Sequence, residues 1–240
     1  MKILSIGNSF SQDSHRYLHA IAKHNNVDIY CVNLDIGGCS LETHYKNIRE
    51  DNANYDLEIN GQPAERRTSI KEALLSDNWD FVTLQQVSSL SGYYSTYNPY
   101  LAELFAYVKQ LAPSAKILIH QTWAYEDKCD LLYNTAHFNS ADEMHSAVQN
   151  AYDQCLSALP FDGCIPSGKV MMKSVKLGIG KIHRDTFHAS YGAGRYLLGL
   201  TWYKTLTGND ITNDTFNDFD EPVSDTQRKI VIEAVNSIVK

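Results

Sequence analysis

A serine near the start of the chain and an Asp-x-x-His motif near its end provide residue types used in nucleophilic catalysis. Ser9 lies in Gly7-Asn8-Ser9-Phe10, and Asp185 and His188 are three residues apart. A serine nucleophile needs a histidine as general base and a carboxylate that orients the imidazole. Each motif also has a purely structural interpretation. Ser9 is a suitable helix N-cap, and Asp185 to His188 could form a turn with a helix cap.

Two further short motifs carry groups that could stabilise an oxyanion. Gly37-Gly38 and Gln85-Gln86 each follow an apolar segment with the pattern of a strand. A glycine N–H and a glutamine amide can both donate to the negative charge that develops on an ester oxygen. The structural alternatives are a tight turn at the glycines and a simple strand end at the glutamines.

The elements that must position these residues alternate along the chain. Apolar segments predict strands over residues 2–7, 28–34, 81–85, 116–120 and 163–165. Apolar residues at helical spacing predict helices over residues 13–24, 99–111, 141–159, 191–206 and 225–239. This alternation predicts an α/β fold in which helices cover both faces of a parallel sheet of about five strands. Such sheets bind ligands at the carboxyl ends of their strands, where all four motifs could meet.

We expect residues 1–240 to form a single domain with one insertion. Residues 52–67 are polar and contain an Asn60-Gly61 pair, which predicts an insertion or a small hairpin. The charge balance is 21 basic and 28 acidic residues, a net charge of −7, and the densest basic run is Arg66-Arg67. These features argue against a nucleic-acid partner.

The sequence predicts neither a membrane segment nor a metal site. No apolar run reaches the roughly 18 residues of a spanning helix, and the apolar start is too short for a signal peptide. We therefore expect a cytoplasmic protein, or a periplasmic or secreted one if a leader was removed. The five cysteines form no Cys-x-x-Cys pair and the nine histidines no His-Glu-x-x-His motif, so we expect no metal and no cofactor.

Together the motifs resemble those of the SGNH (GDSL-type) hydrolases, especially a bacterial branch with no assigned substrate. The resemblance covers roughly residues 1–208 and is carried by residues 6–10, 37–41, 84–86, 120–125, and Asp185 to His188 before Gly194-Arg195-Tyr196. It implies a flavodoxin-like three-layer α/β/α sandwich and hydrolysis of an acyl ester. The positions that match are Ser9 as nucleophile, His188 as general base and Asp185 as its orienting acid.

The resemblance also implies an oxyanion hole formed by the N–H groups of Ser9 and Gly38. The superfamily usually completes this hole with the asparagine of a Gly-x-Asn block, which this chain lacks. We expect the amide of Gln86 to replace it, with Gln85 as the alternative.

Aromatic residues in the loops after the third and fourth predicted strands suggest a sugar-containing substrate. Trp123, Tyr125, Tyr93 and Tyr94 could stack on sugar faces, although such residues also pack cores. We therefore predict a small-molecule or glycan ester, most simply a carbohydrate O-acetyl ester.

Three alternative functions remain open. The chain could be a non-catalytic carbohydrate-binding protein on the same fold, or an esterase or thioesterase of small lipid-like acyl esters. A nucleotide-binding flavodoxin-like protein would need a glycine-rich phosphate loop after the first strand, where only Gly7 is present.

Overall fold

A seven-stranded sheet forms the middle layer of the protein. The computed structural model describes all residues, 1–240. Five strands are parallel in the order β2-β1-β5-β6-β7, and β3 and β4 extend the β2 edge in antiparallel orientation. The strands are β1 (Lys2–Gly7), β2 (Tyr30–Asp35), β3 (Tyr55–Ile59), β4 (Gln62–Thr68), β5 (Phe81–Leu84), β6 (Lys116–His120) and β7 (Gly163–Ile165). The predicted α/β class is confirmed, but the sheet has seven strands because the hairpin joins it.

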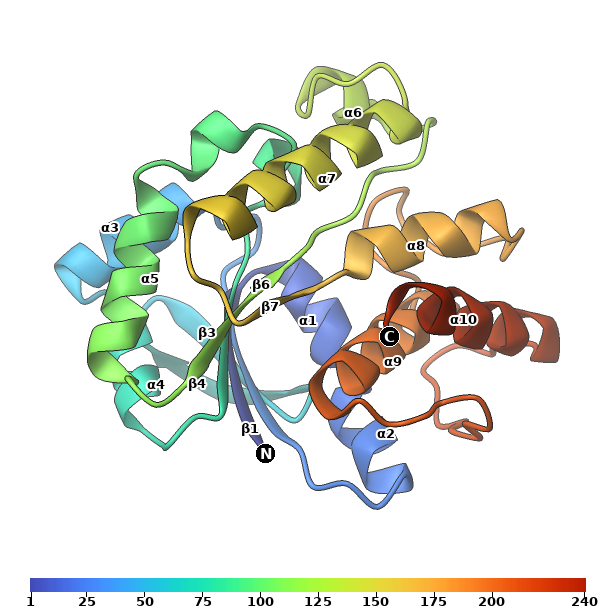
Figure 1. Ribbon diagram of the computed structural model, residues 1–240, viewed down its shortest axis with the longest axis horizontal. Coiled ribbons are helices and arrows are strands. Elements are labelled where there is room, and N and C mark those ends of the chain that lie inside the picture. The colour runs from blue at the N-terminus through green and yellow to red at the C-terminus, as the bar shows by residue number, and fades with distance from the viewer.

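Helices cover both faces of the sheet (Figure 1). One layer contains α3 (Leu41–Glu50), α4 (Ile70–Leu75) and α5 (Tyr100–Leu111). The other contains α1 (Ser9–His15), α2 (Leu18–His24), α8 (Ser167–Lys176), α9 (Ala193–Thr207) and α10 (Asp225–Ile238). The remaining helices are α6 (Asp130–Asn134), α7 (Ala141–Ala158), η1 (Ser88–Leu90) and η2 (Tyr94–Tyr97). The single helix predicted over residues 13–24 is instead the pair α1 and α2.

The register of the parallel strands aligns their carboxyl ends. Gly7 pairs with Asp35 across β1 and β2, while Leu84 pairs with Ile119 across β5 and β6. The segments after β1, β2, β5 and β6 therefore leave the sheet at one edge. This edge is where an open parallel sheet binds its ligands.

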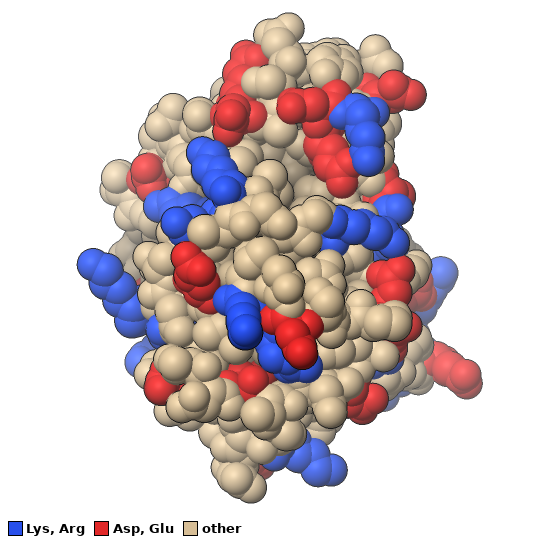
Figure 2. All heavy atoms as spheres, turned by 90° about the vertical axis from the view of Figure 1, so that its right-hand side faces the viewer, with Lys and Arg blue, Asp and Glu red and all other residues tan.

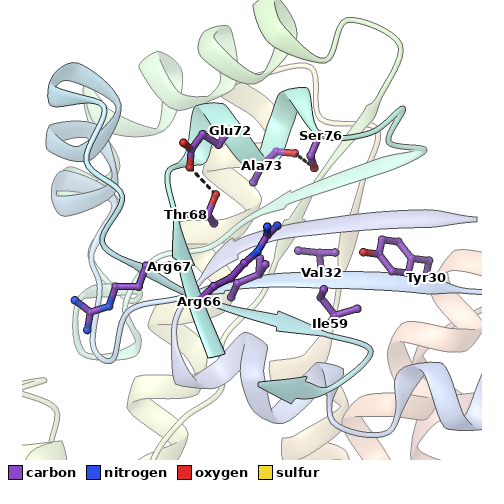
Figure 3. Close-up of a pocket in the computed structure, with 10 residues that line it drawn as sticks. Tyr30, Val32, Ile59, Arg66, Arg67, Thr68, Glu72, Ala73 and Ser76 are labelled. Carbon is purple, nitrogen blue, oxygen red and sulfur yellow. Dashed lines mark hydrogen bonds between the residues drawn. The ribbon is translucent and has the colours of Figure 1, made fainter. Parts of the chain in front are cut away.

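The predicted insertion is the β3–β4 hairpin. Asn60 (φ 53°) and Gly61 (φ 75°) both adopt the positive φ that a two-residue hairpin turn requires. A cavity of about 320 Å³ lies where the hairpin, the sheet and α4 meet. Figure 3 shows Val32, Ile59 and Arg66 among the side chains that line this cavity. Neither Ser9 nor His188 lines it.

The surface of the face that includes α8 and α10 carries mixed charges. Figure 2 shows lysine and arginine side chains interspersed with aspartate and glutamate on this face. None of the helices is both long enough and apolar enough to cross a membrane.

Candidate active site

The fold brings Ser9, His188 and Asp185 into a hydrogen-bonded series. The Oγ of Ser9 lies 2.9 Å from Nε2 of His188. On the other side of the ring, Nδ1 of His188 lies 2.7 Å from Oδ2 of Asp185. Ser9 is the first residue of α1, whereas the other two residues lie in the loop before α9. Residues 179 positions apart thus meet at the carboxyl edge of the sheet.

Asn8, rather than Ser9, caps the helix that begins with the serine. The side-chain oxygen Oδ1 of Asn8 accepts a hydrogen bond from the N–H of Phe10 at 3.1 Å, so the hydroxyl of Ser9 is free to face His188. Gly7 permits this sharp strand-to-helix connection, because a Cβ there would lie 2.2 Å from Oγ of Ser11. The local sequence Gly-Asn-Ser therefore presents the serine at the start of the helix.

The loop that carries Asp185 and His188 is fixed by its own backbone bonds and by neighbouring side chains. His183 and Ala189 form an isolated antiparallel bridge, and the N–H of Arg184 donates to the carbonyl of His188 at 3.0 Å. The indole N–H of Trp123 donates to the carbonyl of Phe187 at 2.7 Å. The position of the imidazole is thus set before any substrate binds.

Asp185 is held in its ionised form. Its partial burial opposes ionisation, but hydrogen bonds from the ring and the backbone N–H of His188 outweigh that effect and lower the pKa of the Asp185 carboxyl. The other carboxylate oxygen accepts from the N–H of His188 at 2.8 Å. An ionised carboxylate at Nδ1 fixes the tautomer in which Nε2 can accept a proton from Ser9.

A buried carboxylate on the helix that begins with Ser9 anchors the loop of His188. Asp13 is fully buried, and both of its oxygens lie 2.8 Å from Nη1 of Arg184. Asp13 also accepts from Nε of Arg195 at 2.8 Å and from the N–H of Ala189 at 3.1 Å. Ala189 directly follows His188, so these contacts tie the loop to α1. Ser9 and Asp13 lie one helical turn apart, but the sequence does not identify Asp13 as a site residue, because no local pattern pairs it with Arg184 or Arg195.

The backbone N–H groups of Ser9 and Gly38 have no acceptor in the helix and the turn that carry them. Ser9 is the first residue of α1, so its N–H has no acceptor within the helix. Gly38 is exposed, its N–H has no partner, and its φ of 67° is a conformation that favours glycine. The amide of Asn8 donates to the carbonyl of Cys39 at 3.0 Å, which holds the Gly38 turn against the start of α1.

The amides of Gln85 and Gln86 are both engaged elsewhere. The Nε2 of Gln86 donates to the carbonyl of Thr96 at 3.1 Å and to its hydroxyl at 3.2 Å, and its oxygen accepts from the N–H of Leu41. The Nε2 of Gln85 donates to Oδ1 of Asn8 at 2.6 Å. Both side chains are buried. The side chain of each glutamine thus braces the loops around it.

Gln85 connects Asn8, the residue before Ser9, to a buried histidine. The Oε1 of Gln85 lies 2.6 Å from Nδ1 of His120, whose Nε2 lies 3.0 Å from Oγ of Ser167. Burial lowers the pKa of His120 to about 3, so the ring is neutral. These polar contacts, from Ser167 through His120 and Gln85, hold the capping side chain of Asn8 in place.

The aromatic residues predicted to stack on sugars are occupied in packing. Trp123 is 1% exposed and stacks on Phe10 with ring centroids 3.9 Å apart, and Tyr125 is 3% exposed. Both rings are packed in the core rather than open to solvent, so the prediction that these two residues stack on a sugar is corrected. Tyr93 and Tyr94 are half-buried. Tyr93 stacks on Phe138 and donates to the carbonyl of Ala136, which fastens the loop after β5 to the segment after α6.

No group of three His, Cys, Asp or Glu side chains is arranged as metal ligands would be. All five cysteines are free thiols.

Comparison with solved structures shows the SGNH hydrolase fold. A protein from Slackia heliotrinireducens, provisionally assigned to the SGNH hydrolases, aligns with a TM-score of 0.60 and 21% identity, over 86% of this chain and 98% of its own. The acetyl xylan esterase AlAXEase aligns with a TM-score of 0.51 and 13% identity, over 84% and 98% of the two chains. No functionally curated protein matches the chain.

One match extends over nearly the whole chain at higher identity. A DUF4886 family protein from Bacteroides uniformis ATCC 8492 aligns with a TM-score of 0.93 and 30% identity, over 99% of this chain and 93% of its own. The family description, a domain of unknown function (DUF4886), matches residues 2–236. On a fold shared with SGNH hydrolases, the chain is therefore a member of the DUF4886 family.

Proposed function

We propose that this protein is a serine esterase that removes acetyl groups from a carbohydrate. The observation that carries the proposal is the series Ser9, His188 and Asp185, with distances of 2.9 and 2.7 Å between the hydrogen-bonding atoms. Both distances lie in the range that proton transfer between a nucleophile and its base requires. The proposal assigns Ser9 as the nucleophile, His188 as the general base and Asp185 as the acid that orients His188.

In the proposed reaction, His188 removes the proton of Ser9 as the serine oxygen attacks the ester carbonyl. The N–H groups of Ser9 and Gly38 donate to the oxyanion of the tetrahedral intermediate. His188 then protonates the leaving alcohol. In the second half, His188 deprotonates a water molecule that attacks the acyl-enzyme and releases the acid. Asp185 stays ionised throughout and stabilises the imidazolium.

The sequence predicts the Gln86 amide as a third oxyanion donor, but this proposal includes no third donor. The Gln86 amide would have to leave Thr96 before it could reach an oxyanion. We therefore propose a hole built from the two backbone N–H groups alone. Loss of one hole donor typically lowers the rate by about 100–1000-fold, so the backbone donor at Gly38 is testable.

The exposure of the residues around Ser9 supports a substrate in which the alcohol part of the ester is bulky and polar. Gly37 and Gly38 are exposed, and the side chain of Asp185 is 45% exposed. A sugar or oligosaccharide could thus approach Ser9 from solvent. Acetyl xylan esterases among the proteins with this fold support the same substrate class.

The test is ester hydrolysis by the wild type and by Ser9→Ala, with Ser157→Ala as control. Ser157 is exposed on α7 and outside the site. The substrates are p-nitrophenyl acetate, butyrate and octanoate, and an acetylated xylo-oligosaccharide. We expect Ser9→Ala to lose at least about 1000-fold in kcat and the control to lose nothing. A Ser9→Ala variant that keeps a tenth of the activity would refute the nucleophile. Sugar binding without turnover of any ester would favour a carbohydrate-binding protein.

A further inference from the structure

A row of buried polar side chains crosses the carboxyl edge of the sheet beside Ser9. Asn8 follows β1, Gln85 follows β5, and His120 is the last residue of β6. Ser167, the first residue of α8, comes shortly after β7. These four residues, the polar row, are each at most 2% exposed. Because β1, β5, β6 and β7 are neighbours in the sheet, each side chain of the row contacts the next.

Two backbone groups fix the orientation of the Asn8 amide. Its Oδ1 accepts from the N–H of Phe10 at 3.1 Å, so this atom must be the oxygen. Its Nδ2 donates to the carbonyl of Cys39 at 3.0 Å, so this atom must be the nitrogen. One side chain thus contacts both the start of α1, which carries the N–H of Ser9, and the turn that carries the N–H of Gly38. A rotation of the Asn8 amide would therefore disturb both donors of the proposed oxyanion hole.

The rest of the polar row has one direction of hydrogen bonding. The Nε2 of Gln85 donates to Oδ1 of Asn8 at 2.6 Å, so Gln85 presents its oxygen to Nδ1 of His120, also 2.6 Å away. Nδ1 must then carry the proton of the ring, because an amide oxygen has no hydrogen to donate. Burial lowers the pKa of His120 to about 3, so at neutral pH the ring has only this proton. Its Nε2 is left to accept from the hydroxyl of Ser167 at 3.0 Å.

These contacts leave the Asn8 amide no second orientation. If the amide turned over, its nitrogen would face the donors of Gln85 and Phe10, and its oxygen would face the carbonyl of Cys39. Both arrangements bring like partners together where water is excluded and an unpaired polar group is costly. Without the amide of Gln85 the constraint is weaker, because Oδ1 of Asn8 then keeps only the N–H of Phe10.

We propose that Gln85 is a positioning residue that orders the oxyanion hole through Asn8, with His120 fixing the orientation of Gln85. Since the hole exists only if the proposed esterase function holds, this role of Gln85 rests on that function. Hole donors accelerate a reaction because they are already aimed at the charge that develops in the transition state. Loss of the Gln85 amide should therefore lower kcat and leave substrate binding largely unchanged.

The first test compares Gln85→Met with Gln121→Met in the hydrolysis of p-nitrophenyl acetate. Methionine is an unbranched side chain that fills irregular space and has no strong hydrogen-bonding group. Gln121 is a matched control, because it is 1% exposed, directly follows β6, and accepts from the N–H of Lys169 at 3.0 Å.

We expect Gln85→Met to lower kcat about 100-fold and to change KM less than about threefold, because the hole donors are displaced but the binding surface is kept. Gln121→Met should stay within about threefold of the wild type in both constants. A kcat of Gln85→Met within about threefold of this control would overturn the proposal.

A double-mutant cycle tests whether Gln85 acts through the hole. Gly38→Ala displaces one hole donor directly. If both changes act on the same hole, the double variant should have a kcat within about threefold of the slower single variant. Losses that multiply would mean that Gln85 acts elsewhere, and would overturn the proposal.

Two variants of His120 keep the test valid if Gln85→Met does not fold. The amide nitrogen of asparagine lies close to the position of Nδ1, so His120→Asn retains a donor to Gln85. His120→Phe keeps a ring that packs on Trp202 but has no donor. We expect His120→Asn to keep kcat within about threefold and His120→Phe to lower it at least about tenfold. Equal kcat values for these two variants would overturn the proposal.

Amide hydrogen exchange separates the role of Gln85 from the proposed function, because it needs no substrate. The N–H of Phe10 donates to Oδ1 of Asn8, so its protection reports on the orientation of Asn8. By NMR of the full chain, this N–H should exchange at least about tenfold faster in Gln85→Met and as in the wild type in Gln121→Met. Unchanged exchange would overturn the role of Gln85 even if Ser9→Ala abolishes hydrolysis. Faster exchange in a protein that hydrolyses no ester would refute the proposed function and, with it, the catalytic role of Gln85.

Discussion

Replacing Asp13 by asparagine should move His188 away from Ser9, although neither of these two residues is changed. The Asp13 carboxylate is fully buried between Arg184 and Arg195, and it also accepts from the backbone N–H of Ala189. Breaking a buried ion pair by removing one partner costs about 3–5 kcal/mol, because the remaining charges stay buried and unpaired. We expect Asp13→Asn to lower the free energy of unfolding by this amount, as measured by urea denaturation.

The same substitution should lower the rate, because Asp13 holds the residue after His188. A displacement of about 1 Å in a catalytic group costs about 100-fold in rate. We therefore expect kcat for p-nitrophenyl acetate to fall about 100-fold at a temperature where circular dichroism shows a folded protein. The control is Asp220→Asn, since Asp220 also pairs with Arg195 but has a side chain that is 32% exposed. It should lose less than about 1 kcal/mol and keep its rate. Our reasoning would be refuted by an Asp13→Asn variant that is destabilised yet has the wild-type kcat.

Three further outcomes are expected. Asp185→Asn should lower kcat about 10²–10⁴-fold with little change in stability, because the neutral amide no longer fixes the tautomer of His188; a loss below tenfold would contradict this role. Gly38→Ala should cost roughly 1 kcal/mol of stability and at least tenfold in kcat, since its φ is 67° although a Cβ there meets no atom within 4 Å. Gly37→Ala, which lacks the positive φ, should change kcat less than twofold. Acid should destabilise the fold through three fully buried histidines whose pKa burial lowers from 6.5 to about 3, namely His15, His44 and His120. Below pH 6.5 the unfolded chain binds protons that the folded chain excludes, so these groups together should lower the free energy of unfolding by roughly 4 kcal/mol per pH unit toward pH 3. Urea denaturation at pH 7, 6 and 5 tests this slope, and a His44→Gln variant with an unchanged slope would contradict it.

The sequence was most informative about which segments form strands and which residues follow them at the carboxyl edge of the sheet. The five parallel strands could be predicted because each is an apolar segment bounded by polar residues, and parallel strands carry their carboxyl ends to one edge. This logic is sufficient to place Ser9 and Gly38 at one edge of the sheet, but not His188, which lies in the loop before α9 and follows no strand. It also predicts the hairpin from Asn60-Gly61, whose residues favour positive φ.

Side-chain direction could not be predicted in the same way. Trp123 and Gln86 do follow strands at the expected edge, but Trp123 turns inward to stack on Phe10 and Gln86 turns to Thr96. Those rotamers depend on residues that are distant in sequence or on the path of a loop. The contacts of Asp13 with arginines 171 and 182 residues away are equally invisible, since no local pattern pairs them.

The β3–β4 hairpin has a consequence for the solubility of the protein. It makes β4 the outermost strand on one side of the sheet. An edge strand has unpaired backbone N–H and C=O groups, to which a strand of another chain can add. β4 opposes this with Pro63, which lacks an N–H, with the exposed charges of residues 65–67, and with an irregular register opposite Asp56 and Glu58. At the other side, β7 has only three residues. Both margins of the sheet thus resist edge-to-edge aggregation.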